Sequence, residues 1–252
     1  MEFVEVSRAG DVVTVVLNRP PVNAVSQAMY QEIHDVFAAM EETHPTAKVV
    51  VLRGAGRHFC AGNDLPEFLG MNETNVSRRM RLVRETFAAV YECPLPTIAA
   101  VHGSALGTGM VFAACCDIVV ASEDARFGTP EVNVGVMGGG RHLARLAGEQ
   151  LTRLMYFTAD PVGAPELARA GRVICVPREE LDARVARIAE RIARHSAVIL
   201  RHAKESLNRV EFMELRAGYE AEQRMTAALM SEPDSLEARR AAAERRPPRY
   251  RS

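Results

Sequence analysis

The chain has little net charge and no long apolar run. Its 31 lysine and arginine residues nearly balance 32 aspartate and glutamate residues, so the net charge is −1. A polyanion finds no overall attractive field on such a chain, and aromatic and basic residues are not interleaved. No segment approaches the roughly 18 to 20 uncharged residues that span a bilayer, and residues 1–17 lack a signal-peptide pattern. These absences predict a soluble, cytoplasmic protein without a membrane partner and disfavour nucleic acid as its partner.

Cysteine is also sparse. The five cysteines include no C-x-x-C pair, and no histidine cluster has zinc-site spacing. An odd number of thiols without such spacing is typical of buried, reduced cysteines in a reducing cytosol. We therefore expect no disulfide framework and no metal site.

The first half of the sequence alternates between strand and helix patterns. Alternating apolar residues predict a hairpin from strands at 3–6 and 12–17. Ser26 can cap a helix with apolar residues at three- and four-residue steps, and residues 76–91 predict a second such helix. Further elements are expected from short apolar runs: strands at 47–52, 97–101 and 117–121, and a helix at 108–115. The order is a loosely recurring β-β-α unit, which favours stacked supersecondary turns over a true repeat array.

The sequence after about residue 150 has a helical pattern almost throughout. Helices are expected from the apolar spacing at 185–192, 198–207, 212–229 and 234–245. A sheet-rich first part and a helix-rich last part favour an α/β core, at residues 1–195, with a helical C-terminal lobe, at residues 196–252. No linker rich in proline, serine or glycine separates the two parts, so we expect the lobe to fold with the core or to dock on a partner subunit.

Three segments break these regular patterns. Residues 60–65 (CAGNDL) and 101–110 (VHGSALGTGM) each run from a strand through glycine into a helix. Each can present a free backbone N–H at a positive helix terminus, and two such donors can form an oxyanion hole. The third segment, 127–131 (FGTPE), places Glu131 after a proline and before an apolar stretch. Burial there would raise the pKa of Glu131 toward the range useful for proton transfer.

Simpler interpretations exist for each segment. Glycine turns are ordinary connectors, and a single glutamate is usually a solvated surface group. The G-x-G at residues 107–109 lacks the spacing and the downstream acid of a nucleotide-binding loop. His102 follows a strand and is more typical of a core histidine, whereas His142 lies in a glycine-rich stretch beside Arg141.

In this order and at these separations, the three segments resemble the crotonase superfamily, also called the enoyl-CoA hydratase/isomerase family. The family's A-G-x-D-L turn matches residues 61–65, and its A-V-x-G-x-A-x-G-x-G pattern matches residues 100–109. The resemblance spans nearly the whole chain. It implies a crotonase-like spiral of β-β-α turns with a helical C-terminal lobe that builds trimers, commonly paired into hexamers. It also implies an acyl-CoA substrate, so coenzyme A enters as part of the substrate and no separate cofactor is expected.

The resemblance also implies roles for individual residues. The family's oxyanion-hole N–H groups fall on Asn63 and Thr108, and its proton-transfer glutamate falls on Glu131. Residues 21–24 (PVNA) match the stretch that lies along the coenzyme A. The residues expected to contact substrate are Val22, Ala24, Ala61, Gly62, Asp64, Leu65, Gly107, Val111, Pro130, Gly139 and His142.

Two departures from the family pattern bear on the reaction. Hydratases of this family carry a second glutamate three residues after the second oxyanion donor, and that position is Val111 here. The loop at 137–143 carries Arg141 and His142 where many relatives have small neutral residues. Either could face a polar acyl tail, or Arg141 could pair with a neighbouring acid.

These departures favour a proton shuttle with one glutamate, which suits double-bond isomerisation or hydration of an activated enoyl-CoA. The alternatives are a decarboxylase or hydrolase of a carboxylated acyl-CoA and, from another class, a non-catalytic or RNA-binding oligomer of the same fold. For the lobe we expect exposed apolar side chains that a trimer would cover. They are Met213, Leu215, Met225 and Leu229.

Overall fold

The computed structural model describes residues 1–251 and is built on a six-stranded sheet with the order β1-β2-β3-β4-β6-β9. The strands β1 (Val4–Ala9) and β2 (Val12–Leu17) form the expected antiparallel hairpin. Every other neighbouring pair in this sheet is parallel. The remaining strands are β3 (Val49–Gly54), β4 (Thr97–Val101), β6 (Ile118–Ser122) and β9 (Ile174–Val176). A second, three-stranded sheet contains β5 (Ser104–Leu106), β7 (Arg126–Gly128) and β8 (Val162–Gly163).

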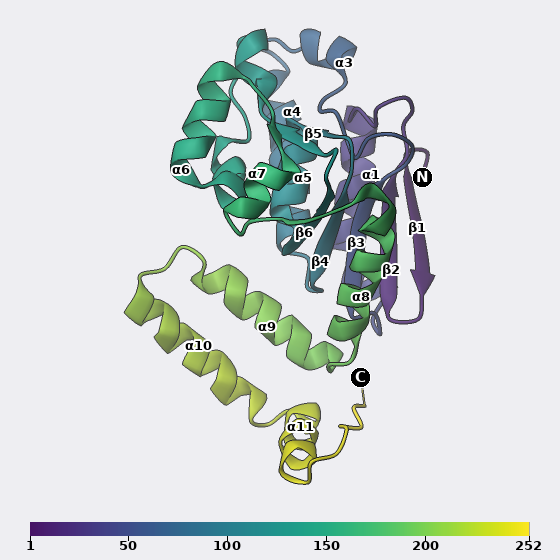
Figure 1. The fold of residues 1–252 in the computed structure, drawn as a ribbon, viewed down its shortest axis with the longest axis vertical. Helices are drawn as coiled ribbons and strands as arrows, with labels where there is room; N and C mark the ends of the chain where they lie inside the picture. Colours follow the sequence, from purple (N-terminus) through teal and green to yellow (C-terminus); the bar gives the residue numbers. More distant parts are fainter. Residues whose placement is uncertain (252) are drawn as a thin grey trace.

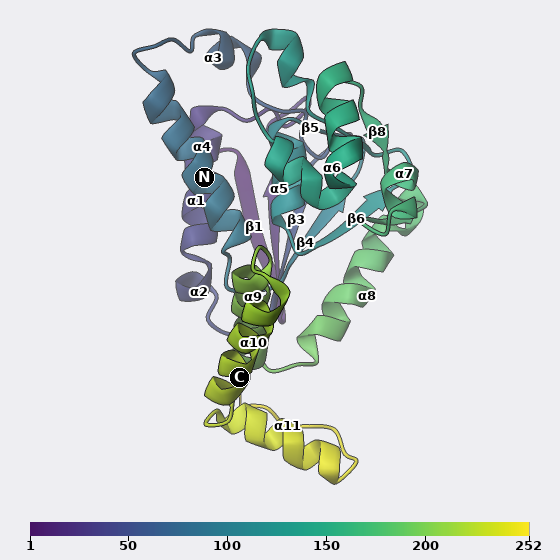
Figure 2. The same ribbon diagram turned by 90° about the vertical axis from the view of Figure 1, so that its left-hand side faces the viewer.

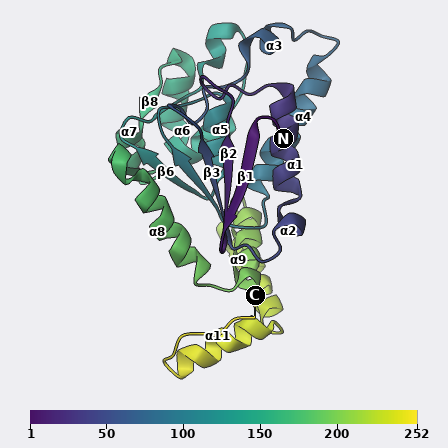
Figure 3. The ribbon, with the colours of Figure 1, turned by 90° about the vertical axis from the view of Figure 1, so that its right-hand side faces the viewer.

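Helices cover both faces of the large sheet, so its parallel strands are buried on both sides. On β3, Val50 and Leu52 belong to the core beneath α1 (Gln27–Ala38), α4 (Val76–Tyr91) and α5 (Thr108–Cys115). The alternate residues Val49 and Val51 pack with α8 (Leu181–Ala193) on the other face. Figure 3 shows α1 and α8 on opposite sides of the sheet. This division follows from the two-residue period of a strand.

The start of α1 follows from the sequence. The Ser26 side chain accepts a hydrogen bond from the N–H of Met29 at 3.2 Å and starts α1, as expected. A non-helical Gly148 interrupts the long helix α6 (Gly140–Thr158). The remaining short elements of the core are α2 (Met40–Thr43), α3 (Leu65–Leu69), α7 (Ala164–Arg169) and the 3-10 turns η1 (Pro130–Val134) and η2 (Arg178–Glu180).

The C-terminal lobe extends away from the sheet. It contains α9 (Ala197–Val210), α10 (Leu215–Leu229) and α11 (Pro233–Ala243). The helices α9 and α10 lie side by side, and α11 is the farthest from the sheet (Figures 1 and 2). An ion pair ties the lobe to the core, with Nζ of the buried Lys204 on α9 at 2.6 Å from Asp117 Oδ1. The boundary expected between residues 195 and 196 stays a prediction.

Several sequence expectations need correction. The region after residue 150 is largely helical, as expected, but the short strands β8 and β9 also lie within it, and α6 begins earlier, at Gly140. Two of the four apolar side chains expected to be exposed, Met225 and Leu229, are half-buried because they line the groove between α9 and α10. Within residues 1–251, no helix combines the length and the apolar character needed to cross a membrane.

Candidate active site

A cavity of about 290 Å³ lies where the three segments identified in the sequence meet. The helix α3 contributes Leu65 and Phe68, and η1 contributes Pro130 and Val134, so much of the wall is apolar. The other lining residues are Ala61, Gly62, Asn63, Gly107, Glu131 and Asn133. Glu131 is the one ionisable side chain among these lining residues.

Two short bridges bring the loops of the cavity together. Cys60 pairs with Ala105, since the N–H of Cys60 donates to Ser104 O at 2.9 Å and Cys60 O accepts from the N–H of Leu106 at 3.0 Å. This contact places the loop that carries Asn63 beside the loop that leads into α5. The sequence segments 60–65 and 101–110, which are about 40 residues apart, therefore form one site.

The backbone N–H of Asn63 is left free by the second bridge. Val25 pairs with Asn63 through the residues on either side, because Gly62 O accepts from Val25 N at 2.8 Å and the N–H of Asp64 donates to Val25 O at 2.9 Å. In a parallel bridge of this kind the N–H of the central residue points to the opposite side. The Asn63 N–H accordingly has no acceptor in the described part of the chain.

The N–H of Thr108 is free because Thr108 is the first residue of α5. The first hydrogen bond of this helix joins the N–H of Val111 to Gly107 O at 3.0 Å, and the N–H of Gly107 itself donates to Gly128 O at 2.9 Å. No acceptor among residues 1–251 takes the N–H of Thr108. The positive end of the helix dipole is therefore next to this free donor.

A tyrosine that no sequence motif indicated connects the two donor residues. The hydroxyl of Tyr30, on α1, lies 2.7 Å from Asn63 Oδ1 and 2.6 Å from Thr108 Oγ1. The only signal in the sequence is that Tyr30 is a polar member of the buried face that also contains Met29 and Ile33. Because Asn63 and Thr108 contact the same hydroxyl, the two predicted oxyanion residues are neighbours.

Glu131 lies in the first turn of η1, with its carboxyl against Gly107 in the loop that leads into α5. A Cβ atom added to Gly107 would lie 2.8 Å from Glu131 Oε1. The other carboxyl oxygen, Oε2, is buried and has no hydrogen-bond partner among the described residues. Burial raises the pKa of Glu131, and its own backbone N–H opposes this only in part. A carboxyl with a raised pKa, held in a cavity beside two free N–H donors, is suited to accept and return a proton.

Gly107 permits this close approach. Its φ of +52° is a backbone conformation that residues with a side chain rarely adopt, and any side chain would contact the Glu131 carboxylate. The glycine therefore allows both the turn into α5 and the close approach of the Glu131 carboxyl to this turn.

The comparison with known families agrees with this geometry. Residues 7–252 match the family described as enoyl-CoA hydratase/isomerase. The chain belongs to this family. Its members process acyl-CoA thioesters, and the expected crotonase fold is confirmed by the solved structures that resemble the chain. One of them is an enoyl-CoA hydratase from Bacillus anthracis, with a TM-score of 0.92, 32% identity and 98% of each chain covered.

Named relatives of the enoyl-CoA hydratase/isomerase family differ in their reactions. The chain is 37% identical over 220 residues to a (7aS)-7a-methyl-1,5-dioxo-2,3,5,6,7,7a-hexahydro-1H-indene-carboxyl-CoA hydrolase from Rhodococcus jostii, which covers 86% of the chain and 85% of the relative. It is 34% identical over 253 residues to a 2,3-dehydroadipyl-CoA hydratase from Escherichia coli, with 98% and 97% covered. Family membership therefore fixes the class of substrate but not the reaction.

Three residues expected to contact substrate, Val22, Ala24 and Asp64, do not line the cavity. In the structure they form hydrogen bonds and an ion pair within the surrounding loops. Val22 O accepts from the N–H of Ala61 at 3.0 Å, and Ala24 O accepts from the guanidinium of Arg19 at 2.9 Å. Asp64 caps α3 and pairs with Arg19 at 2.7 Å. The capping hydrogen bond and the arginine hold the pKa of Asp64 below its usual value. Its carboxylate therefore serves the loop structure.

Gly139 and His142 at the start of α6, and Val111 on α5, do not line the cavity. A Cβ atom on Gly139 would lie 3.0 Å from the Cγ2 of Val111, which is itself buried in α5. The His142 ring packs on Phe87 with the centroids 5.6 Å apart, and burial lowers the pKa of His142. None of the three lines the cavity, so their contact with substrate stays a prediction.

One alternative from the sequence is that Arg141 pairs with a neighbouring acid. Within residues 1–251, Arg141 forms no ion pair. Its guanidinium stacks on the ring of Phe212 at 4.5 Å, and the arginine of α6 that pairs with an acid is Arg145, at 2.7 Å from Glu211. Within the same described range, no group of three or more histidine, cysteine, aspartate or glutamate side chains could hold a metal ion.

Proposed function

We propose that the protein stabilises a thioester enolate in an oxyanion hole and moves the proton with one carboxyl group, that of Glu131. The observation that carries this proposal is the placement of Glu131 as the one ionisable group lining the cavity, against the loop that presents Thr108. Two preorganised N–H donors in such a site can each contribute about 3 kcal/mol or more to enolate formation.

In the proposed reaction, the N–H groups of Asn63 and Thr108 donate to the thioester oxygen of the acyl-CoA. The Glu131 carboxylate takes a proton from carbon 2, and the electron pair of that C–H bond moves into the enolate. For a 3-enoyl-CoA, the protonated Glu131 then delivers the proton to carbon 4 and the double bond shifts to carbon 2. Hydration of the 2-enoyl product would need a second group to hold water, and Val111 occupies the position where related hydratases have a glutamate.

A second candidate is hydrolysis of an acyl-CoA that carries a ring ketone. It is favoured by relatives from Rhodococcus jostii and Mycobacterium tuberculosis, 37% and 38% identical, that are named as hydrolases of a dioxo-hexahydroindene-carboxyl-CoA. Glu131 would take a proton from water as the water attacks the ketone. Where that ketone is β to the thioester, cleavage of the carbon–carbon bond leaves an enolate that the same N–H donors can hold.

A substrate panel tests the proposal and separates the candidates. The panel contains a 2-enoyl-CoA, a 3-enoyl-CoA and a cyclic 3-oxoacyl-CoA, each tested with the natural protein, Glu131→Gln and the exposed control Glu149→Gln. We expect 3-enoyl-CoA turnover that falls by on the order of a hundredfold or more in Glu131→Gln, with CoA-ester binding retained, and no change in the control. Unchanged turnover in Glu131→Gln would refute the proposal. If the protein acts on the cyclic 3-oxoacyl-CoA alone and cleaves it, the second candidate is supported.

A further inference from the structure

Tyr30 is fully buried at the meeting point of three helices. Its ring centroid lies 6.2 Å from that of Phe87 on α4 and 6.2 Å from that of Phe112 on α5. The ring is therefore held from two sides, and the position of its hydroxyl is set by the core.

The hydrogen bonds of the Tyr30 hydroxyl have a fixed direction. Asn63 Oδ1 is a carbonyl oxygen and can only accept, so the single phenolic proton is donated to it. The contact of 2.6 Å with Thr108 Oγ1 must then be a bond in which the threonine hydroxyl donates to the tyrosine oxygen. A directed chain results, from Thr108 through Tyr30 to Asn63.

This chain joins the two residues whose backbone N–H groups form the proposed oxyanion hole. Asn63 belongs to a loop held on its other side by Val25, and Thr108 begins α5. Apart from this hydroxyl, the described residues give no side-chain partner to Asn63 Oδ1 or Thr108 Oγ1. Tyr30 therefore ties both side chains to the buried core.

We propose that Tyr30 is a positioning residue that sets the spacing of the two oxyanion N–H donors. The inference rests on the proposed function, because it assumes that these donors bind the thioester oxygen. Tyr30 does not line the cavity, so it acts through Asn63 and Thr108 and not on the substrate. A misplacement of about 1 Å in a catalytic group can cost on the order of a hundredfold in rate. Loss of the hydroxyl that links Asn63 to Thr108 should therefore lower the rate measurably.

Tyr30→Phe tests the proposal because it removes only the hydroxyl and keeps the ring. We expect kcat to fall by about tenfold or more while KM changes by less than about threefold, since preorganised donors act mainly on the transition state. The matched control is Tyr91→Phe, which removes a tyrosine hydroxyl that bonds Glu211 at 2.7 Å and lies outside the cavity. Thermal unfolding of both variants records any loss of stability.

A spectroscopic measurement separates positioning from a structural effect. Acetoacetyl-CoA can bind as its enolate, which has its own ultraviolet band, whereas butyryl-CoA offers only a neutral thioester. We expect Tyr30→Phe to lower the bound enolate fraction by about tenfold and to leave butyryl-CoA binding unchanged, as a looser oxyanion hole requires. An enolate fraction equal to that of the natural protein and of Tyr91→Phe would overturn the role of Tyr30.

Two variants of Thr108 keep the inference testable if Tyr30→Phe does not fold. Thr108→Ser retains the donated hydrogen bond, whereas Thr108→Val removes it at nearly constant volume. We expect the enolate band of Thr108→Val to be weaker than that of Thr108→Ser by about threefold or more, since in the valine variant Tyr30 loses one of two partners. Equal bands in the two variants would contradict the inference. If the natural protein itself binds no enolate, the proposed function fails, and the inference fails with it.

Discussion

Glu131 ionises in a site that disfavours its charge, and this has a consequence for the pH dependence of turnover. Burial raises the pKa of Glu131 above the ordinary glutamate value of 4.5. The base must be ionised to accept a proton, so kcat/KM should fall as the pH decreases through this raised pKa. A pH–rate profile with an acid limb clearly above that of an ordinary glutamate is expected. A limb at or below pH 4.5 would show that the base is another group.

The raised pKa of Glu131 should also change how the stability of the fold depends on pH. Because the pKa is raised in the folded state, the proton favours the folded protein. That contribution is complete below the unfolded pKa and is lost as the pH rises through the folded pKa. Glu131→Gln should therefore unfold at a higher temperature than the natural protein above this range and at the same temperature in acid.

The Glu131 carboxylate lies so close to Gly107 that a side chain at this position should displace it. Gly107→Ala should lower turnover by about a hundredfold or more, because its Cβ would push the Glu131 carboxylate away from the second donor. It should also destabilise the fold by about 1 to 3 kcal/mol, because φ is +52° there. Gly10→Ala is the control, since Gly10 has φ of +58° but nothing within 4 Å of an added Cβ. Similar losses of activity in both variants would mean that backbone strain alone is responsible.

That Glu131, Asn63 and Thr108 lie close together could be predicted from the sequence, because they lie in motifs with fixed spacing. Tyr30 could not, because a single hydroxyl on an apolar helix face gives no sign of its partners on other elements. The contact of His142 with substrate rests on sequence position alone and stays a prediction. Its ring packs on Phe87, a residue 55 positions earlier, and such contacts depend on tertiary packing.

Among the elements, the N-terminal turn of α5 carries the residue that the proposed function links to the choice between isomerisation and hydration. Val111 is buried in this turn, beside Gly139. Val111→Glu restores a carboxylate where related hydratases have one, and we expect hydration to rise relative to isomerisation by about tenfold or more. Both rates are measured on 2-enoyl- and 3-enoyl-CoA, with circular dichroism to confirm folding, because a buried charge is costly.

Val111→Gln is the matched control for this prediction, since it has the same size but cannot act as a base. An equal increase in hydration for Val111→Gln and Val111→Glu would indicate added space for water. No change in the ratio for a folded Val111→Glu would contradict the assigned role of this position.

The elements that the sequence predicted well are those with a long or fully apolar pattern. The expected bounds 76–91, 97–101 and 108–115 coincide with α4, β4 and α5. The strands β8 and β9 have two and three residues, too few to show an alternation, and hydrogen bonds to distant strands define them. Pairing across the sheet, which sequence patterns do not record, was therefore the missing information.

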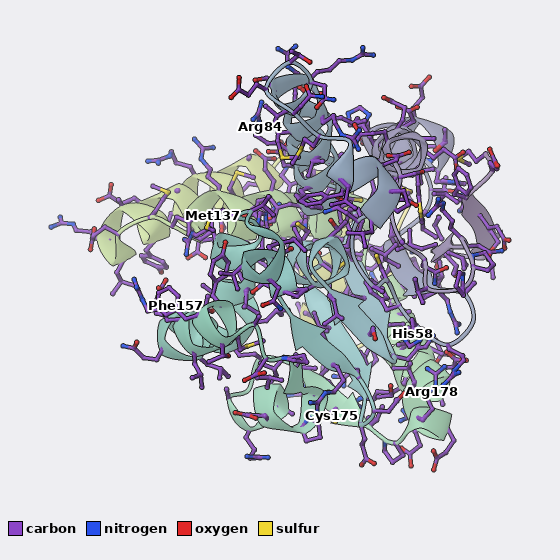
Figure 4. The ribbon with its side chains drawn as sticks, turned by 90° about the horizontal axis from the view of Figure 1, so that it is seen from above. His58, Arg84, Met137, Phe157, Cys175 and Arg178 are labelled. Atoms are coloured by element: carbon purple, nitrogen blue, oxygen red, sulfur yellow. The ribbon has the colours of Figure 1, made fainter. Side chains whose placement is uncertain are left out.

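For the whole molecule, the lobe suggests assembly. Leu215, Tyr219 and Phe212, on or beside α10, are 87%, 62% and 60% exposed, and Met137 and Phe157 are exposed around α6 (Figure 4). Large apolar side chains that stay exposed on neighbouring elements are a feature of interfaces. We expect light scattering at micromolar concentration to give three or six times the mass of one chain and Leu215→Glu to lower it. A monomeric natural protein would contradict this prediction.

In the proposed reaction, one carboxyl group both removes and returns the proton. A 3-enoyl-CoA deuterated at carbon 2, incubated with the protein in ordinary water, tests this. If Glu131 alone carries the hydron, part of the label should appear at carbon 4 of the 2-enoyl product, and simple 2-enoyl-CoA should be hydrated slowly. Rapid hydration of 2-enoyl-CoA with no label at carbon 4 would rule out a single proton carrier, because a second group would then have to activate the water.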